Sequence, residues 1–170
     1  MTGLFNRHHF MEKVDDIIIQ NQAGGDGKSH GVLFILLDEY KQIKDRSGLA
    51  LADHYTTDIG KLIKDTCEHL DISARFSDSC FMVLVTEKGV NETMEVAEDL
   101  RKAIEGHISE LNGTSASSTS SIGIVMLGDA SGNAHDVVNL ADHACTTAKS
   151  QGGNRVFLHK TSFDAKISQE

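Results

Sequence analysis

The stretch ISARFSDSCFMVLVT (residues 72–86) decides the fold that we expect for this chain. Two apolar runs flank the short polar sequence SDSC (77–80). Runs of this length, joined by a few polar residues, are typical of a β-hairpin. We therefore predict two neighbouring strands, at 72–76 and 80–86, in the middle of the chain.

Helices and further strands alternate around this hairpin. Apolar residues at helical spacing predict helices at 4–21, 49–70, 93–111 and 134–150, with a short helical turn at 40–46. Apolar runs predict strands at 32–38, 121–127 and 155–159. Asn91 stands where the N-cap of the third long helix belongs. This order predicts a single α/β (α+β) unit, with a central sheet of mixed direction and helices packed on it.

Composition excludes several classes of partner. The 170 residues suffice for one domain, and 16 basic against 25 acidic side chains give a net charge of −9. Such an acidic surface repels phosphate backbones, so we expect no nucleic-acid partner. No apolar run approaches the roughly 20 residues of a membrane span, and we find no signal peptide, so we expect a cytoplasmic domain. The three cysteines lack CxxC spacing, and we expect reduced thiols without metal or cofactor.

Two segments resemble known phosphate-binding or metal-binding motifs but do not meet their spacing. Gly27-Lys28-Ser29 resembles the end of a P-loop, but the first glycine of that motif would fall on Gln22, and the loop precedes a strand instead of following one. His135, Asp142 and His143 share one predicted helix. Their spacings of seven and eight residues from His135 do not form a chelating cluster, so we interpret them as helix surface.

Five segments stand in an order that resembles the GGDEF family, the diguanylate cyclase domains of bacterial cyclic di-GMP signalling. They are TGLFNRHHF (2–10), LLDEYKQIKDRSGLALAD (36–53), ARFSDSCF (74–81), SIGIV (121–125) and ADHACTTAKSQGGNRV (141–156). The resemblance spans residues 2 to 156. It implies a GGDEF fold, which is a mixed sheet of about five strands with a β-hairpin, a nucleotide-cyclase or ferredoxin-like core and helices on both sides.

The resemblance also implies which residues occupy the catalytic positions. Family members use two metal ions to hold the triphosphate of GTP and to activate a ribose hydroxyl, and hard cations such as Mg²⁺ prefer carboxylate oxygens. The first metal-binding acid corresponds to Leu36, while the acid two residues later is present as Asp38. The GGDEF signature itself corresponds to Ser77, Asp78, Ser79, Cys80 and Phe81. The sequence therefore predicts a degenerate signature that lacks the catalytic and metal-binding acids, and we expect no catalytic residue and no bound metal.

Positions around the nucleotide are kept in part. The asparagine that recognises guanine corresponds to Lys44, whereas the acid that ends the same motif is present as Asp53. The phosphate-side lysines correspond to Lys41 and Lys149, but the arginine expected four residues after Lys149 is Gly153. We interpret Asp38, Lys41, Asp53 and Lys149 as vestigial nucleotide-binding residues.

The inhibitory site of the family does not match. Its RxxD motif falls on residues 68–71, where Glu68 replaces the arginine and Asp71 is kept. An arginine that would bind guanine and phosphate is therefore a glutamate. We expect this feedback site for cyclic di-GMP to be lost.

These matches lead to a functional expectation. We expect residues 1–160 to form a degenerate GGDEF domain, not an enzyme, that regulates or scaffolds cyclic di-GMP signalling. Residues 161–170 would begin a linker to a downstream EAL domain, as in regulators of the FimX type. Partners would be an adjacent EAL or sensor domain, another protein or a second copy. Two alternatives stay open, namely a GTP sensor without turnover and a residual diguanylate cyclase.

Overall fold

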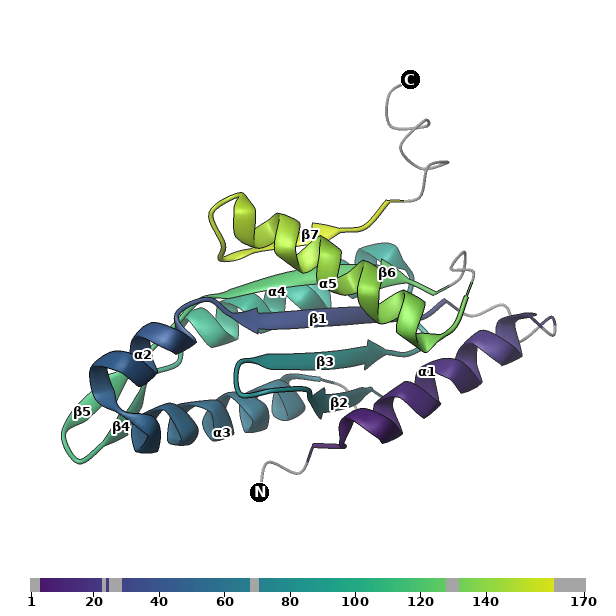
Figure 1. Ribbon diagram of the computed structural model, residues 1–170. Helices are drawn as coiled ribbons and strands as arrows, with labels where there is room; N and C mark the ends of the chain where they lie inside the picture. The colour runs from purple at the N-terminus through teal and green to yellow at the C-terminus, as the bar shows by residue number, and fades with distance from the viewer. Residues whose placement is uncertain (1–3, 23, 25–28, 68–70, 128–131, 161–170) are drawn as a thin grey trace.

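The computed structural model describes residues 4–22, 24, 29–67, 71–127 and 132–160 (Figure 1). Its helices are α1 (Arg7–Gln22), α2 (Tyr40–Ser47), α3 (Leu49–Thr66), α4 (Val90–Glu105) and α5 (Ala134–Ser150). Its strands are β1 (Gly31–Leu37), β2 (Ile72–Arg75), β3 (Cys80–Val85), β4 (Ser109–Leu111), β5 (Thr114–Ala116), β6 (Ser120–Met126) and β7 (Arg155–Leu158). Residues 161–170, expected to begin a linker, lie outside the described part of the chain.

Five strands form the central sheet in the order β2-β3-β1-β6-β7. β1 lies between β3 and β6 and is antiparallel to both, whereas β7 runs parallel to β6. The mixed sheet and its five strands confirm the predicted fold class. Along the chain, β1-α3-β2-β3-α4-β6 reproduces the order of a ferredoxin-like core, with β2 and β3 as its hairpin.

Helices cover both faces of this sheet (Figure 1). On one face α3 and α4 pack against a core that includes Leu33, Phe81 and Ile122. On the other face α1 and α5 pack against a second core that includes Val32, Met82 and Val125. Because strand side chains alternate between faces, each central strand contributes to both cores. Within the described residues, no helix combines the length and the apolar character needed to cross a membrane.

The α5 layer lies unusually close to the sheet at Gly123. A Cβ atom at this position would overlap the backbone of Ala141 and Cys145 in α5. Glycine therefore permits the close approach of helix and strand that a larger residue would prevent. This contact places the C-terminal end of α5 beside the ends of β1 and β6.

The predicted hairpin is confirmed. β2 and β3 pair antiparallel with Arg75 opposite Phe81, and the turn is closed by the amide of Phe76, which donates to the carbonyl of Cys80 at 2.9 Å. The helix predicted at 134–150 is also confirmed at both ends. The helix predicted at 49–70 ends earlier, at Thr66.

The helix predicted at 93–111 is wrong at both ends. It begins at Val90, where Gly89 is the N-cap and supplies no side chain, so Asn91 lies inside the helix. It ends at Glu105, and residues 109–111 belong instead to a second hairpin of β4 and β5, which the sequence interpretation missed. The physical reason is the turn Asn112-Gly113, because both residues adopt positive φ, as a two-residue hairpin loop requires.

Candidate functional site

Two predicted positions, Leu36 and Cys80, meet across the sheet at the C-terminal end of β1. Leu36 lies directly opposite Cys80 of β3 on one side and opposite Ser121 of β6 on the other. Directly opposed residues point to the same face, so this cross-strand row faces the α1 and α5 layer. The structure therefore brings together the residues at two positions that bind metal or phosphate in the family, and here they carry an alkyl group and a thiol.

The hairpin turn closes one side of this row. Its Ser79 carbonyl accepts a hydrogen bond of 2.9 Å from the amide of Leu37. Arg75 folds over the turn, donating to the Ser77 carbonyl at 3.1 Å and reaching the Asp78 carboxylate at 3.5 Å. The Asp78 side chain is 68% exposed, so this contact is weak and open to solvent.

Asp38 follows directly after β1, and its carboxylate lies where several donors converge. The hydroxyls of Thr119 and Ser121 each donate to it at 2.6 Å, and the amide of Asn154 donates at 3.0 Å. The Lys149 ammonium lies 3.3 Å from the carboxylate and also donates to the Asp38 carbonyl at 2.9 Å. Four groups from β6, α5 and the segments beside them therefore hold a single acidic side chain.

Hydrogen bonding decides the ionisation of Asp38. Burial alone would raise its pKa, but the bonds from Ser121, Thr119 and Asn154, together with Lys149, hold that pKa below its usual value. The Asp38 side chain is only 6% exposed, whereas that of Lys149 is 44% exposed. The carboxylate is therefore internal, whereas the Lys149 side chain is partly exposed to solvent.

The remaining nucleotide positions lie on α2 and α3. Lys41 and Asp53 are both exposed, and no hydrogen bond joins them within the described residues. Tyr40 lies beside this region with its hydroxyl buried and unpaired. Burial raises the pKa of Tyr40, with further contributions from Asp78 and Asp53, so the hairpin turn and α3 both lie near this ring.

Cys80 behaves as a neutral thiol. Burial, followed by the nearby Cys145 and Asp142, raises the pKa of Cys80 to about 12. A thiolate is the form that binds metals and attacks electrophiles, so this cysteine is not activated. The described residues contain no cluster of three or more His, Cys, Asp or Glu side chains suited to a metal ion.

The inhibitory motif lies partly outside the described residues, since Glu68 is not among them. Asp71 is described, and its carboxylate accepts from the amide of Thr86 at 3.0 Å and lies 3.6 Å from the Lys88 ammonium. The Asp71 side chain is fully buried. This residue therefore stabilises the connection after β3.

Sequence reasoning missed three residues of the site. Thr119 and Asn154 bind Asp38 from 81 and 116 residues away along the chain, and Ser121 was interpreted only as part of a structural motif. Ser121 and Asn154 lie in segments that match the family, SIGIV and ADHACTTAKSQGGNRV, but the sequence interpretation treated these matches as structural. No pattern indicated Thr119.

Comparison with known proteins gives a family match and several relatives. The family model described as "Diguanylate cyclase, GGDEF domain" matches residues 1–155. Diguanylate cyclase A of Treponema denticola is 29% identical over 163 residues, covering 95% of this chain and 44% of that protein. Diguanylate cyclase DosC of Escherichia coli K12 is 30% identical over 167 residues, covering 95% of this chain and 35% of that protein. The chain thus spans less than half the length of these relatives.

Solved structures agree on the architecture. The GGDEF domain of FimX from Pseudomonas aeruginosa has a TM-score of 0.83 and 31% identity, covering 91% of this chain and 94% of that domain. The GGDEF domain of TpbB (YfiN) from the same species has a TM-score of 0.86 and 25% identity, covering 99% and 97%. The expected fold and the resemblance of the sequence are both confirmed.

The same relatives contradict one expectation. We expected that the chain is not an enzyme, but the curated relatives that match 95% of it are named as diguanylate cyclases. The expectation of a non-enzyme therefore does not stand. The unusual residues at Leu36, Ser79 and Cys80 describe this site without deciding its activity.

Proposed function

Because the chain belongs to the GGDEF family of diguanylate cyclase domains, we propose that it acts as a regulatory module in cyclic di-GMP signalling. One observation carries the proposal. The acid that follows β1, Asp38, is held by four donors inside the protein, and the row beside it consists of Leu36, Cys80 and Ser121. This end of the sheet is well suited to hold a fixed shape that another domain can contact.

The partner that we propose is a neighbouring domain of the same protein, either an EAL domain or a sensor. The matched relatives are more than twice as long as the segment that they share with this chain, so they contain further parts. Domains joined in one chain are expected to move relative to one another unless their interface is large and hydrophobic, so a neighbouring domain can respond to this one. A separate protein or a second copy of this chain would serve the same role.

A guanine nucleotide is the second candidate, as the ligand through which the module senses its surroundings. The half-exposed ammonium of Lys149 favours it, because this group is fixed by Asp38 and still open to an anionic phosphate. Lys41 and Asp53 are exposed on α2 and α3, where phosphate and a guanine edge would find a cation and an acceptor.

Calorimetric titration of the chain with GTP and Mg²⁺ tests the nucleotide. We expect binding that Lys149→Gln weakens by about tenfold, the cost of one charge-assisted hydrogen bond. Lys102→Gln is the matched control, because Lys102 is an exposed lysine of α4, on the other face of the sheet, and should leave affinity unchanged. No heat at millimolar nucleotide would exclude the nucleotide and leave only the scaffolding role.

Turnover must be measured in parallel, since the relatives are named as cyclases. Conversion of GTP into cyclic di-GMP is compared between the natural chain and the triple variant Leu36→Asp, Ser79→Asp, Cys80→Glu. We expect the variant to produce more cyclic di-GMP, because it supplies the oxygen ligands that divalent cations prefer. If the natural chain is as fast as the variant, those three positions are not the ones that limit catalysis.

The regulatory role itself is tested in the full-length protein. The output of the neighbouring domain, measured as turnover or binding of cyclic di-GMP, is compared with and without GTP. We expect a change that Lys149→Gln removes and that Lys102→Gln retains. Identical output for a protein in which residues 4–160 are deleted would contradict any regulatory role.

A further inference from the structure

We infer that Arg101 and Asn154 are positioning residues that connect α4, on one face of the sheet, to Asp38 and Lys149 on the other. The chain of contacts passes around the edge of the sheet, through the segment that joins α5 to β7. This inference deepens the proposed nucleotide site and rests on it only for the identity of the ligand. The contacts themselves form a continuous path from Glu98 and Glu105 to Lys149.

The path begins on α4. The Arg101 guanidinium binds the Glu98 carboxylate through two nitrogens, with Nη2 donating at 3.0 Å and Nε at 3.2 Å. Glu105 lies one turn further along, 3.9 Å from Nη1. The Arg101 side chain is 15% exposed, whereas both glutamates are more than 40% exposed. The arginine is therefore fixed while its acidic partners face solvent.

Asn154 is held at both ends of its side-chain amide. Its Oδ1 accepts from Arg101 Nη1 at 2.9 Å, and its Nδ2 donates to the Glu105 carboxylate. Its backbone has a φ of 48°, a left-handed conformation that asparagine tolerates better than most residues. A side chain clamped in this way fixes the direction of its own backbone amide.

That amide points at the site. The Asn154 N–H donates to Asp38 Oδ2 at 3.0 Å, the same oxygen that accepts from Thr119. The preceding Gly153 lies so close that a Cβ there would be 3.1 Å from this oxygen. The Lys149 ammonium binds the other carboxylate oxygen at 3.3 Å. Rotation of the Asp38 carboxylate would therefore move the lysine contact as well.

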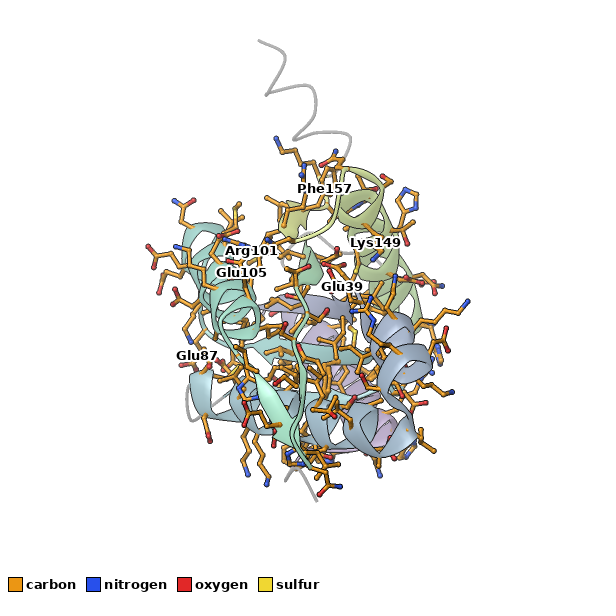
Figure 2. All side chains as sticks on the ribbon, turned by 90° about the vertical axis from the view of Figure 1, so that its left-hand side faces the viewer. Glu39, Glu87, Arg101, Glu105, Lys149 and Phe157 are labelled. Atoms are coloured by element: carbon orange, nitrogen blue, oxygen red, sulfur yellow. The ribbon has the colours of Figure 1, made fainter. Side chains whose placement is uncertain are left out.

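The two helices at the ends of the path belong to different layers. Figure 2 shows Arg101 and Glu105 on α4 and Lys149 on α5, at the same end of the molecule. The acidic side chains of α4 are the exposed members at the α4 end of the path. A partner that binds or neutralises Glu98 or Glu105 would therefore change the restraint on Asp38, and with it the position of the Lys149 ammonium.

Nuclear magnetic resonance of the chain tests this path without any ligand. We expect Arg101→Ala to speed solvent exchange of the Asn154 backbone amide by about tenfold, the effect of losing one such restraint. It should also shift the side-chain ammonium signal of Lys149. Lys102→Ala, the next residue of the same helix, is the matched control and should change neither signal.

Two further variants separate positioning from general stability. Asn154→Gly keeps a backbone that accepts positive φ and keeps the amide, but it removes the tether to α4, so it should shift the Lys149 signal as Arg101→Ala does. In the Asn154→Gly background, Arg101→Ala should add no further shift. Arg101→Lys retains charge without the planar donor geometry and should restore the signal only in part.

The outcome that overturns the inference is clear. If Arg101→Ala and Asn154→Gly both leave the Lys149 signal and the amide exchange at residue 154 unchanged, α4 does not position the site. If the two variants shift these signals in the folded chain while the natural chain binds no GTP, the path stands and the nucleotide proposal fails. If GTP binds to the natural chain and both variants weaken that binding equally, the path contributes to the binding of GTP.

Discussion

Asp38 and Asp78 lie close to the same end of β1 and β3, yet they are held in opposite ways. Asp38 is 6% exposed and accepts from three neutral donors and one ammonium group. Asp78 is 68% exposed and contacts only Arg75, at 3.5 Å, among the described residues. An acidic residue near a family signature is therefore no guide to function by itself, because its surroundings decide whether it is structural or merely solvated.

The difference also explains which part of this site is rigid. The surroundings of Asp38 combine β6, α5 and the loop before β7, so several distant segments must be correctly folded to satisfy it. The turn around Asp78 satisfies most of its backbone locally, through Arg75 and the amides that donate to the Cys80 carbonyl, with one further bond from the Leu37 amide to the Ser79 carbonyl. The hydrogen bonds of Asp38 therefore depend on the whole fold, whereas the contact of Asp78 depends on a single turn.

The largest loss of stability should follow from removing Asp38, the acid with more hydrogen bonds. Asp38→Ala leaves the Thr119 and Ser121 hydroxyls and the Asn154 amide without their acceptor, and it leaves Lys149 without its anion. We expect the free energy of unfolding to fall by about 3 kcal/mol or more, because three largely buried donors lose a charged acceptor. Urea unfolding measures this free energy. A loss of less than about 1 kcal/mol would mean that the donors find other partners.

A smaller loss of stability should follow from removing one of the hydrogen-bond donors to Asp38. Ser121→Ala deletes the hydroxyl that binds Asp38 Oδ1 at 2.6 Å but leaves the other three donors. We expect a loss of about 1–2 kcal/mol, the value of one hydrogen bond to a charged group. In the Asp38→Ala background the same substitution should cost almost nothing, and an undiminished cost would show that the two side chains are not coupled.

The pH dependence of stability should follow Asp38 as well. Its pKa is lower in the folded chain than in the unfolded one, so its contribution is fully present above the ordinary aspartate pKa of about 3.9. That contribution is lost as the pH falls through the lower folded value. Asp38→Asn should therefore flatten the loss of stability below about pH 4, measured by urea unfolding across pH, and an unchanged profile would contradict this assignment.

The smallest loss of stability should follow from removing Asp78. Asp78→Ala removes a largely exposed side chain with one long contact, and we expect the free energy of unfolding to change by less than about 0.5 kcal/mol. The same urea experiment provides the measurement. A loss as large as that of Ser121→Ala would show that the turn contributes more to the fold than its exposure indicates.

Local patterns predicted most of the fold. The β2–β3 hairpin and α5 follow from apolar runs and spacing, and the five-stranded sheet follows from the resemblance. The β4–β5 hairpin was missed because its strands are polar and only three residues long. Strands this short do not show the alternation of apolar and polar residues by which strands are predicted. The dipeptide Asn112-Gly113 was the one available signal, since it favours a two-residue hairpin turn.

The site was predictable as a set of positions but not as a set of contacts. Matching motifs indicated Leu36, Asp38, Cys80 and Lys149, and the sheet register brings the first three to one end of β1. The hydrogen bonds to Asp38 come from residues 81 to 116 positions away, and a single sequence carries no record of such pairings. For the same reason the path through Arg101 and Asn154 could not be found before the structure.

The Asn112-Gly113 turn has a practical consequence for experiments on this protein. Both residues are exposed, the hairpin that carries them packs on α3, and neither residue makes any of the hydrogen bonds to Asp38 described above. Exposed loop tips of this kind tolerate insertions well. A fluorescent label or a short affinity tag placed between Asn112 and Gly113 would thus provide a handle for the measurements proposed above while leaving the surroundings of Asp38 untouched.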